Sequence, residues 1–256
     1  MNRIDKLFRE KEGNLLSVYF TAGYPWLNSV EEIILSAEKN GANMMEIGIP
    51  YSDPLADGPV IQETGKTAIA NGMTIKNLFS QLHGIRKKTS IPLLLMGYLN
   101  PIMQFGFTRF CREASDTGID GLIIPDLPLF EYENHYKDDI LSCDLKNIFL
   151  VTPDTSDERI RKIDEASTGF LYLVSSASTT GKTQEFGQKQ LEYFKRVNSL
   201  KLKNPLMAGF GIYNRETLDQ AFCYCNGAIV GSAFMREFQK GKPVEETVHN
   251  FFQSLK

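Results

Sequence analysis

Three carboxylates stand in one short stretch of the chain, residues 45–59, which reads MEIGIPYSDPLADGP. Glu46 lies among apolar residues, where an ionised carboxylate is costly, and Asp53 and Asp57 follow among turn-forming residues. Burial raises the pKa of a carboxyl group toward neutrality, as general acid–base catalysis requires. In a strand, Glu46 and Gly48 share one face, and Gly48 leaves room beside the acid. Glu46 is therefore a candidate acid–base residue, with a buried glutamate satisfied by local hydrogen bonds as the simpler interpretation.

Eight short apolar runs alternate with longer amphipathic segments along the chain. The runs predict strands at residues 15–20, 44–49, 93–97, 121–124, 148–151, 170–174, 206–209 and 228–230. The amphipathic segments predict helices at residues 30–39, 75–88, 107–116, 131–140, 158–166, 191–200, 216–225 and 244–255, with an extra helix at 4–11. Continuous apolar strands are typical of a parallel sheet that is covered on both faces.

Eight strand–helix units in 256 residues favour the α/β class and a (β/α)8 TIM barrel, a single domain over residues 1–256 with an extra N-terminal helix. The alternative is a doubly wound open sheet, which usually carries G-x-G-x-x-G after its first strand. Here that position reads TAGYPWLNS. The active site of a barrel lies at the C-terminal ends of its strands. The barrel interpretation therefore places Glu46 at the mouth and favours catalysis.

Glycines stand at the ends of the last three predicted strands. Gly181 lies in a Ser/Thr-rich loop, Gly209 and Gly211 end the seventh strand, and Gly231-Ser232 precedes a helix. Backbone N–H groups at such places bind phosphate, and the recurrent phosphate site of barrels uses the loops after strands seven and eight. Ordinary turn chemistry explains each glycine taken alone. Together they predict an enzyme that acts on a phosphorylated small molecule.

Composition and charge exclude several classes of function. The net charge of −3, without a run of like charges, gives little support for nucleic-acid binding. The charged first residues resemble no signal peptide, and no stretch approaches the ~18 apolar residues that span a bilayer. We expect a soluble, cytoplasmic protein. The four cysteines and three histidines show no metal-ligand spacing, so we expect free thiols and no metal site.

The stretch EIGIPYSDPLADGPVIQ strongly resembles the signature of the tryptophan synthase alpha subunit family. The resemblance continues with FTAGYP after the first strand, NP after the third, PDLP after the fourth, GFGI after the seventh and GSA after the eighth. It implies the barrel fold and the retro-aldol cleavage of indole-3-glycerol phosphate to indole and D-glyceraldehyde 3-phosphate. In this family Glu46 matches the principal acid–base and Asp57 the second catalytic carboxylate, which accepts a hydrogen bond from the indole N–H.

The resemblance implies a further set of substrate-binding positions. They are Tyr19, Tyr172 and Phe210 as aromatic positions, and Thr180, Gly181, Gly211, Gly231 and Ser232 at the phosphate. Tyr19 and Phe210 could instead be residues of the hydrophobic core. Residues 175–181 suit a mobile lid. Two places depart from the family pattern: the loop after the sixth strand reads SSASTTGKT where many members carry an arginine and a glycine before Thr-Gly, and Tyr213 stands where a serine is common.

The resemblance also implies a partner. In this family a pyridoxal-phosphate-dependent beta subunit receives indole through a tunnel and joins it to serine, within a heterotetramer of two alpha and two beta chains. Asp53-Pro54 and Asn100-Pro101 would face that partner. We expect no cofactor in this chain itself.

Three other functions remain open at this point. A stand-alone lyase that releases free indole would have almost the same sequence. A phosphosugar isomerase or epimerase would share the phosphate corner, but it typically needs a lysine, histidine or aspartate pair at other strand ends. A non-catalytic barrel that regulates a partner would not need both Glu46 and Asp57, and both are present.

Overall fold

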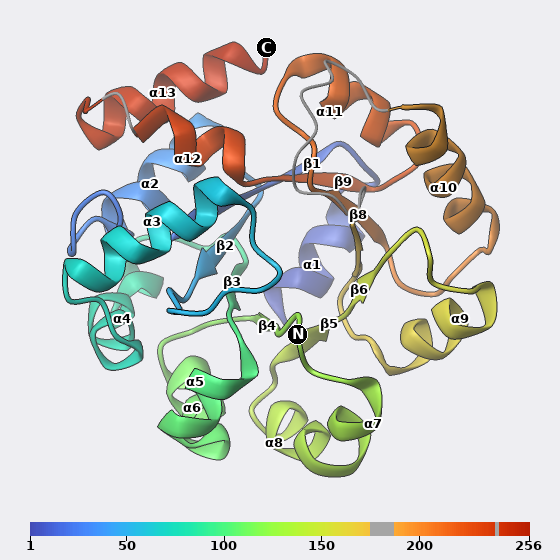
Figure 1. Cartoon of the computed structure of the whole chain (residues 1–256), viewed down its shortest axis with the longest axis horizontal. Coiled ribbons are helices and arrows are strands. Elements are labelled where there is room, and N and C mark those ends of the chain that lie inside the picture. The colour runs from blue at the N-terminus through green and yellow to red at the C-terminus, as the bar shows by residue number, and fades with distance from the viewer. Residues whose placement is uncertain (175–186, 239–240) are drawn as a thin grey trace.

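A parallel barrel forms the centre of the molecule (Figure 1). The computed structural model describes residues 1–174, 187–238 and 241–256. The strands of these ranges are β1 (Leu15–Thr21), β2 (Met44–Gly48), β3 (Leu93–Met96), β4 (Gly121–Ile123), β5 (Lys146–Ile148), β6 (Leu150–Val151), β7 (Leu171–Val174), β8 (Leu206–Gly209) and β9 (Gly227–Val230). Their order is β5-β4-β3-β2-β1-β9-β8-β7-β6, so the first strand pairs with the last. All eight predicted strands are found, and the (β/α)8 barrel is confirmed.

The fifth strand of the barrel is split at Phe149. Its first part, β5, pairs with β4, and its second part, β6, pairs with β7. The N–H of Tyr172 on β7 donates a hydrogen bond to the carbonyl of Phe149 at 3.0 Å. The residue between β5 and β6 is therefore also hydrogen-bonded to the neighbouring strand. The nine strands therefore occupy the eight positions of a closed barrel.

Helices surround the strands in the view down the barrel (Figure 1). Within the described ranges they are α1 (Arg3–Glu10), α2 (Val30–Asn40), α3 (Pro59–Ala70), α4 (Ile75–Leu82), α5 (Leu99–Phe105), α6 (Phe107–Asp116), α7 (Leu129–Glu131), α8 (Lys137–Ser142), α9 (Asp157–Ala166), α10 (Gln188–Ser199), α11 (Arg215–Phe222), α12 (Ser232–Phe238) and α13 (Val244–Ser254). Among these helices, none has the length and apolar character needed to cross a membrane.

The predicted extra N-terminal helix is α1, and it closes the N-terminal end of the barrel. Ile4 is fully buried in the same apolar cluster as the barrel-interior residues Met44 and Leu94. The side chain of Arg3 forms an ion pair with the buried carboxylate of Asp120 at 2.9 Å. The helix α1 therefore covers the barrel interior at this end, and the C-terminal ends of the strands lie at the other.

Several helices differ from the predicted ranges. The helix predicted at 75–88 ends at Leu82, because Gly84 takes a left-handed conformation with φ of 81° and a short 3₁₀ turn follows. The helix predicted at 131–140 is divided into α7, a π-helical turn and α8. The helix α3 was not predicted, because the sequence DGP is typical of a turn. Pro59 is instead its first residue, where the missing N–H costs nothing.

Two apolar layers hold the barrel together. The larger fills the space between strands and helices, and the smaller fills the barrel interior. Strand residues alternate between the two layers, so Leu15 and Met44 point inward while Val18 and Met45 point outward. The same alternation turns Ser17 and Glu46 inward.

Candidate active site

Glu46 is a fully buried acid in the barrel interior. It lies in the middle of β2, and its side chain has no exposed surface. The hydroxyl of Ser17 on β1 donates a hydrogen bond to Oε1 at 3.0 Å, whereas Oε2 has no hydrogen-bond partner in the described part of the chain. Burial raises the pKa of Glu46 to about 8, and the hydrogen bond from Ser17 opposes this rise. Glu46 is thus poised to give and take a proton near neutral pH.

Asp57 is half-buried in the segment that joins β2 to α3. Burial raises its pKa to about 6, and a hydrogen bond with the hydroxyl of Tyr98 lowers it. The Tyr98 hydroxyl also accepts a hydrogen bond from the N–H of Ala56 at 2.9 Å, so one side chain holds both the carboxylate of Asp57 and the backbone of the preceding residue. Because its pKa is lower than that of Glu46, Asp57 is the more ionised of the two acids at neutral pH.

Tyr98 was not predicted as a site residue from the sequence. The residue follows β3 and packs its ring on Tyr51 at a centroid distance of 5.3 Å. The available signal was a polar aromatic residue directly after an apolar strand, at the end of the barrel where active sites lie.

Two tyrosines point into the barrel beside the carboxylates. A Cβ atom added to Gly48 would lie 2.0 Å from the hydroxyl of Tyr19, and one added to Gly209 would lie 2.3 Å from the ring of Tyr172. The room that Gly48 leaves is therefore occupied by the end of Tyr19. Gly209, which the sequence suggested for phosphate, makes space for Tyr172. Burial is the main cause that raises the pKa of both phenols above the ordinary value, so both remain neutral.

The end of β8 presents a strained aromatic residue to the same mouth. Phe210 has φ of 63° and Gly211 has φ of 74°, and left-handed backbone is costly for a bulky side chain such as that of Phe210. The ring of Phe210 meets that of Tyr172 edge-on at a centroid distance of 6.0 Å. Strain of this kind is typical of functional sites.

The remaining predicted positions are at the ends of β7 and β9. Gly231 follows β9, and Ser232 begins α12, so backbone N–H groups of a helix start lie here. A Cβ atom on Gly231 would be 3.5 Å from the ring of Tyr19, which brings β9 close to the aromatic pair. Thr180, Gly181 and the predicted lid at 175–181 lie outside the described residues.

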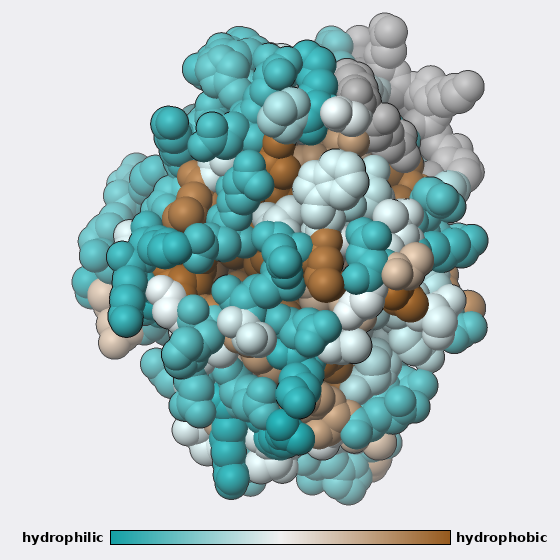
Figure 2. All heavy atoms as spheres, turned by 90° about the vertical axis from the view of Figure 1, so that its left-hand side faces the viewer, coloured by the Kyte–Doolittle hydropathy of each residue, from teal (hydrophilic) through white to brown (hydrophobic). Residues whose placement is uncertain are grey.

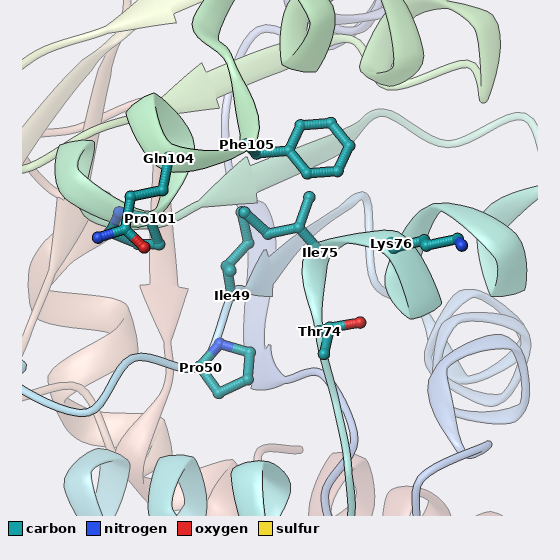
Figure 3. A pocket seen from close by; sticks show the side chains of 8 residues that line it. All are labelled: Ile49, Pro50, Thr74, Ile75, Lys76, Pro101, Gln104 and Phe105. Atoms are coloured by element: carbon teal, nitrogen blue, oxygen red, sulfur yellow. The ribbon is translucent and has the colours of Figure 1, made fainter.

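A cavity of about 400 Å³ lies on the rim rather than in the barrel (Figure 3). Its lining residues are Ile49, Pro50, Thr74, Ile75, Lys76, Pro101, Gln104 and Phe105. Figure 3 shows Ile75 and Phe105 close together while Lys76 points away. Neither carboxylate of the candidate site lines this cavity. Pro101, which the sequence resemblance places toward a partner, does.

No metal centre emerges from the described residues. Within residues 1–174, 187–238 and 241–256, no cluster of three or more histidine, cysteine, aspartate or glutamate side chains could hold a metal ion. The four cysteines are free thiols. Taken together, a parallel barrel with a buried acid on its inner face and a second carboxyl group after the same strand is typical of an enzyme of the TIM-barrel class.

Comparison with known proteins identifies the family. A sequence model of the tryptophan synthase alpha chain matches residues 5–255. The alpha chain of Christiangramia forsetii is 55% identical over 240 residues, covering 94% of this chain and 93% of that one. The alpha chain of Bacteroides fragilis is 51% identical over 248 residues, covering 97% and 94%. The chain belongs to the tryptophan synthase alpha chain family.

Solved structures agree with this assignment. The crystal structure of tryptophan synthase subunit alpha from Legionella pneumophila has a TM-score of 0.90 and 32% identity, covering 100% of this chain and 97% of that one. The resemblance found in the sequence, the barrel fold and the lyase class of enzyme are thereby confirmed. The roles of individual residues rest on the geometry described above.

Proposed function

We propose that Glu46 and Asp57 carry out the retro-aldol cleavage of indole-3-glycerol phosphate in this chain. The observation that carries the proposal is the state of Glu46: a buried acid whose pKa is raised to about 8 and whose Oε2 has no partner among the described residues. A carboxyl group in that state is protonated at neutral pH and still close enough to its pKa to exchange the proton in both directions.

The proton balance of the reaction needs only one such group. Glu46 in its acid form gives its proton to C3 of the indole, which turns the ring into an electron sink. The bond between C3 and the glycerol chain then breaks, and its electron pair returns to the ring. The neighbouring hydroxyl of the glycerol becomes the aldehyde carbonyl and passes its proton to Glu46, which restores the acid form.

Asp57 would act as the electrostatic partner. Protonation of C3 places positive charge on the indole nitrogen, and an ionised carboxylate that accepts the N–H hydrogen bond stabilises that charge. The pKa of about 6 leaves Asp57 largely ionised at neutral pH. Tyr98 anchors the carboxylate through its hydroxyl. Two acids whose environments separate their pKa values thus take two roles.

The substrate would lie between aromatic walls and a phosphate site. Tyr19, Tyr172 and Phe210 supply the aromatic surface beside the acids. For the phosphate we propose backbone N–H groups of Gly211, Gly231 and Ser232, together with Thr180 and Gly181 of the loop after β7. The position of Ser232 at the start of α12 supports this proposal, because helix starts favour anions.

We infer that the partner is a pyridoxal-phosphate-dependent beta subunit, in a heterotetramer of two alpha and two beta chains, and that the cytoplasm is the compartment. The segments after β2, β3 and β4 expose the large apolar side chains of Leu55, Met103 and Phe130, which are 96%, 52% and 68% exposed. Exposed apolar surface at the mouth favours a protein partner there. This chain would need no cofactor of its own. A stand-alone lyase that releases indole is the alternative.

Replacement of Glu46 by glutamine tests the catalytic assignment. Glu46→Gln keeps the shape of the side chain and removes the transferable proton, so we expect turnover to fall by ~10³-fold or more. Release of indole from indole-3-glycerol phosphate measures turnover, and circular dichroism checks the fold. Glu32→Gln, on the exposed face of α2, is the matched control and should keep full activity. A folded Glu46→Gln variant with activity close to that of the wild type would move the acid–base role elsewhere.

A further inference from the structure

The inward face of β1 carries a small polar side chain where a barrel normally holds a bulky apolar one. The interior cluster around it consists of large apolar residues, among them Leu15, Met44 and Ile229. Ser17 belongs to the same inward-facing row as Leu15 and is fully buried. A buried hydroxyl in an apolar layer is costly unless it has a partner, and the partner of Ser17 is Glu46.

The register of the two strands places this serine on one side of the acid. Tyr19 is the β1 residue paired with Glu46, and Ser17 is paired with Met44, so Ser17 lies one inward position closer to the closed end of the barrel. Its hydroxyl donates to Oε1 at 3.0 Å. A serine hydroxyl has a single proton to donate, so only one carboxyl oxygen is held in this way. Oε2 is left without a partner in the described part of the chain.

We propose that Ser17 is a positioning residue for the acid–base Glu46, which it orients by donating to Oε1 so that Oε2 alone exchanges protons with the substrate. This inference rests on the proposed function of Glu46. When Glu46 is protonated, its proton belongs on Oε2, because Oε1 already accepts a hydrogen bond. A fixed proton position and a fixed rotamer hold the carboxyl group in the geometry that proton transfer needs, and this lowers the entropic cost of the step.

Ser17 also favours the ionised form of Glu46. A hydrogen bond donated to a carboxylate stabilises its charge, and it therefore opposes the effect of burial on the Glu46 pKa. The other titratable groups that interact electrostatically with Glu46 are Tyr19 on β1 and Tyr172 on β7, among the residues whose placement is described. The charge of Asp57 raises the pKa of both tyrosines. Both phenols remain neutral across the working pH range, so Ser17 is the nearby group that tunes the acid.

Replacement of Ser17 in the full-length chain tests this role directly. In Ser17→Ala we expect the Glu46 pKa to rise by about one unit, measured by NMR titration of glutamate labelled with ¹³C at the carboxyl carbon. The assignment of the Glu46 signal comes from its loss in Glu46→Gln. Ser17→Thr, which keeps the hydroxyl, should bring the pKa back toward the wild-type value. Ser36→Ala removes the same hydroxyl from a buried serine of α2 and should leave the pKa unchanged.

Kinetics give the second readout. Because the reaction starts from protonated Glu46, activity falls as pH rises through the Glu46 pKa, and this basic limb should move to higher pH in Ser17→Ala. We expect kcat to fall about tenfold while KM changes little, since substrate contacts are kept. A purely structural serine would lower stability and leave the Glu46 pKa and the basic limb in place. An unchanged pKa in folded Ser17→Ala overturns the inference.

The experiments distinguish the role of Ser17 from the proposed cleavage activity. The NMR titration needs no substrate, so it reports on the link between Ser17 and Glu46 even if the chain does not cleave indole-3-glycerol phosphate. Cleavage that depends on Glu46, together with an unshifted pKa in Ser17→Ala, contradicts only the role of Ser17. A shifted pKa without any cleavage contradicts the proposed function and, with it, the catalytic part of this inference.

Discussion

At the scale of single residues, the proposed chemistry depends on two carboxyl groups kept in different states. Glu46 is fully buried and its pKa is about 8, whereas half-buried Asp57 has a pKa of about 6 with Tyr98 as its anchor. Burial is the main cause of both shifts, and the deeper group shifts more. At neutral pH the protein therefore offers one proton donor and one anion at the same open end of the barrel.

Burial of Glu46 makes the stability of the fold depend on pH. The ordinary pKa of 4.5 rises to about 8 in the folded chain, so between these values the folded state binds more protons than the unfolded state. Stability from this group is complete below pH 4.5 and is lost as pH rises toward 8. We expect Glu46→Gln to gain stability over the wild type across this window, by an amount on the order of 3 kcal/mol.

Urea unfolding of both proteins at pH 5 and pH 8 measures this difference. Asp57 is present in both, so its own contribution cancels in the comparison. Free energies of unfolding that change in parallel between the two pH values would show that Glu46 is not held in its neutral form.

One of the two acids stands out in the sequence by its pattern, whereas the other is identified only by the resemblance to a known family. Glu46 stood out because a carboxylate within an apolar strand is rare. Asp57 looked like an ordinary turn residue, and only its burial and its contact with Tyr98 separate it from Asp53, which is exposed. Ser17 could not be recognised as a functional candidate, because its proposed role comes from the pairing of β1 with β2 and not from its own neighbours in the sequence.

At the scale of elements, large side chains of one strand fill the space that glycines leave on the neighbouring strand. Glycines on β2 and β8 have no side chain where Tyr19 from β1 and Tyr172 from β7 extend. Tyr19 thus lies over β2, the strand that carries Glu46, and Tyr172 lies over the end of β8. The sequence predicted space at Gly48, but it could not predict what fills that space, since the answer lies on another strand.

Replacement of Gly48 by alanine tests this arrangement. The new Cβ atom would lie 2.0 Å from the hydroxyl of Tyr19, so the ring must move. We expect a stability loss of about 1–3 kcal/mol in urea unfolding and a higher KM for the substrate. Gly65→Ala on α3 is the matched control, because its nearest atom is 4.0 Å away, and it should raise stability by about 0.5–1 kcal/mol. Equal stability of Gly48→Ala and wild type would contradict the packing described.

Strands were easier to predict than helices for a physical reason. A strand of a closed barrel is apolar on both faces, so its run of residues is unmistakable. The segments α3 and α5 begin at Pro59 and at Leu99 beside prolines, where local sequence favours turns. Their helical form depends on the neighbouring elements, as α3 packs against α12 and β1.

At the scale of the whole molecule, the two ends of the barrel are different. The end closed by α1 is held by buried contacts such as those of Asp120, whereas the open end carries both acids and the exposed side chains of Leu55, Met103 and Phe130. A different face, seen from the left-hand side of Figure 1, is mostly hydrophilic, with apolar residues visible in the gaps (Figure 2). The mouth thus combines the proposed catalytic residues with exposed apolar side chains, which suits the partner subunit proposed above.

The most direct test of the proposed function is the cleavage assay with the purified wild-type chain. Indole is measured after incubation with indole-3-glycerol phosphate, once with the chain alone and once with an added beta subunit of the same family. We predict weak activity of the chain alone and strong stimulation by the partner. Full activity without the partner would instead favour the stand-alone lyase. The absence of indole in both arms would contradict the function proposed for this chain.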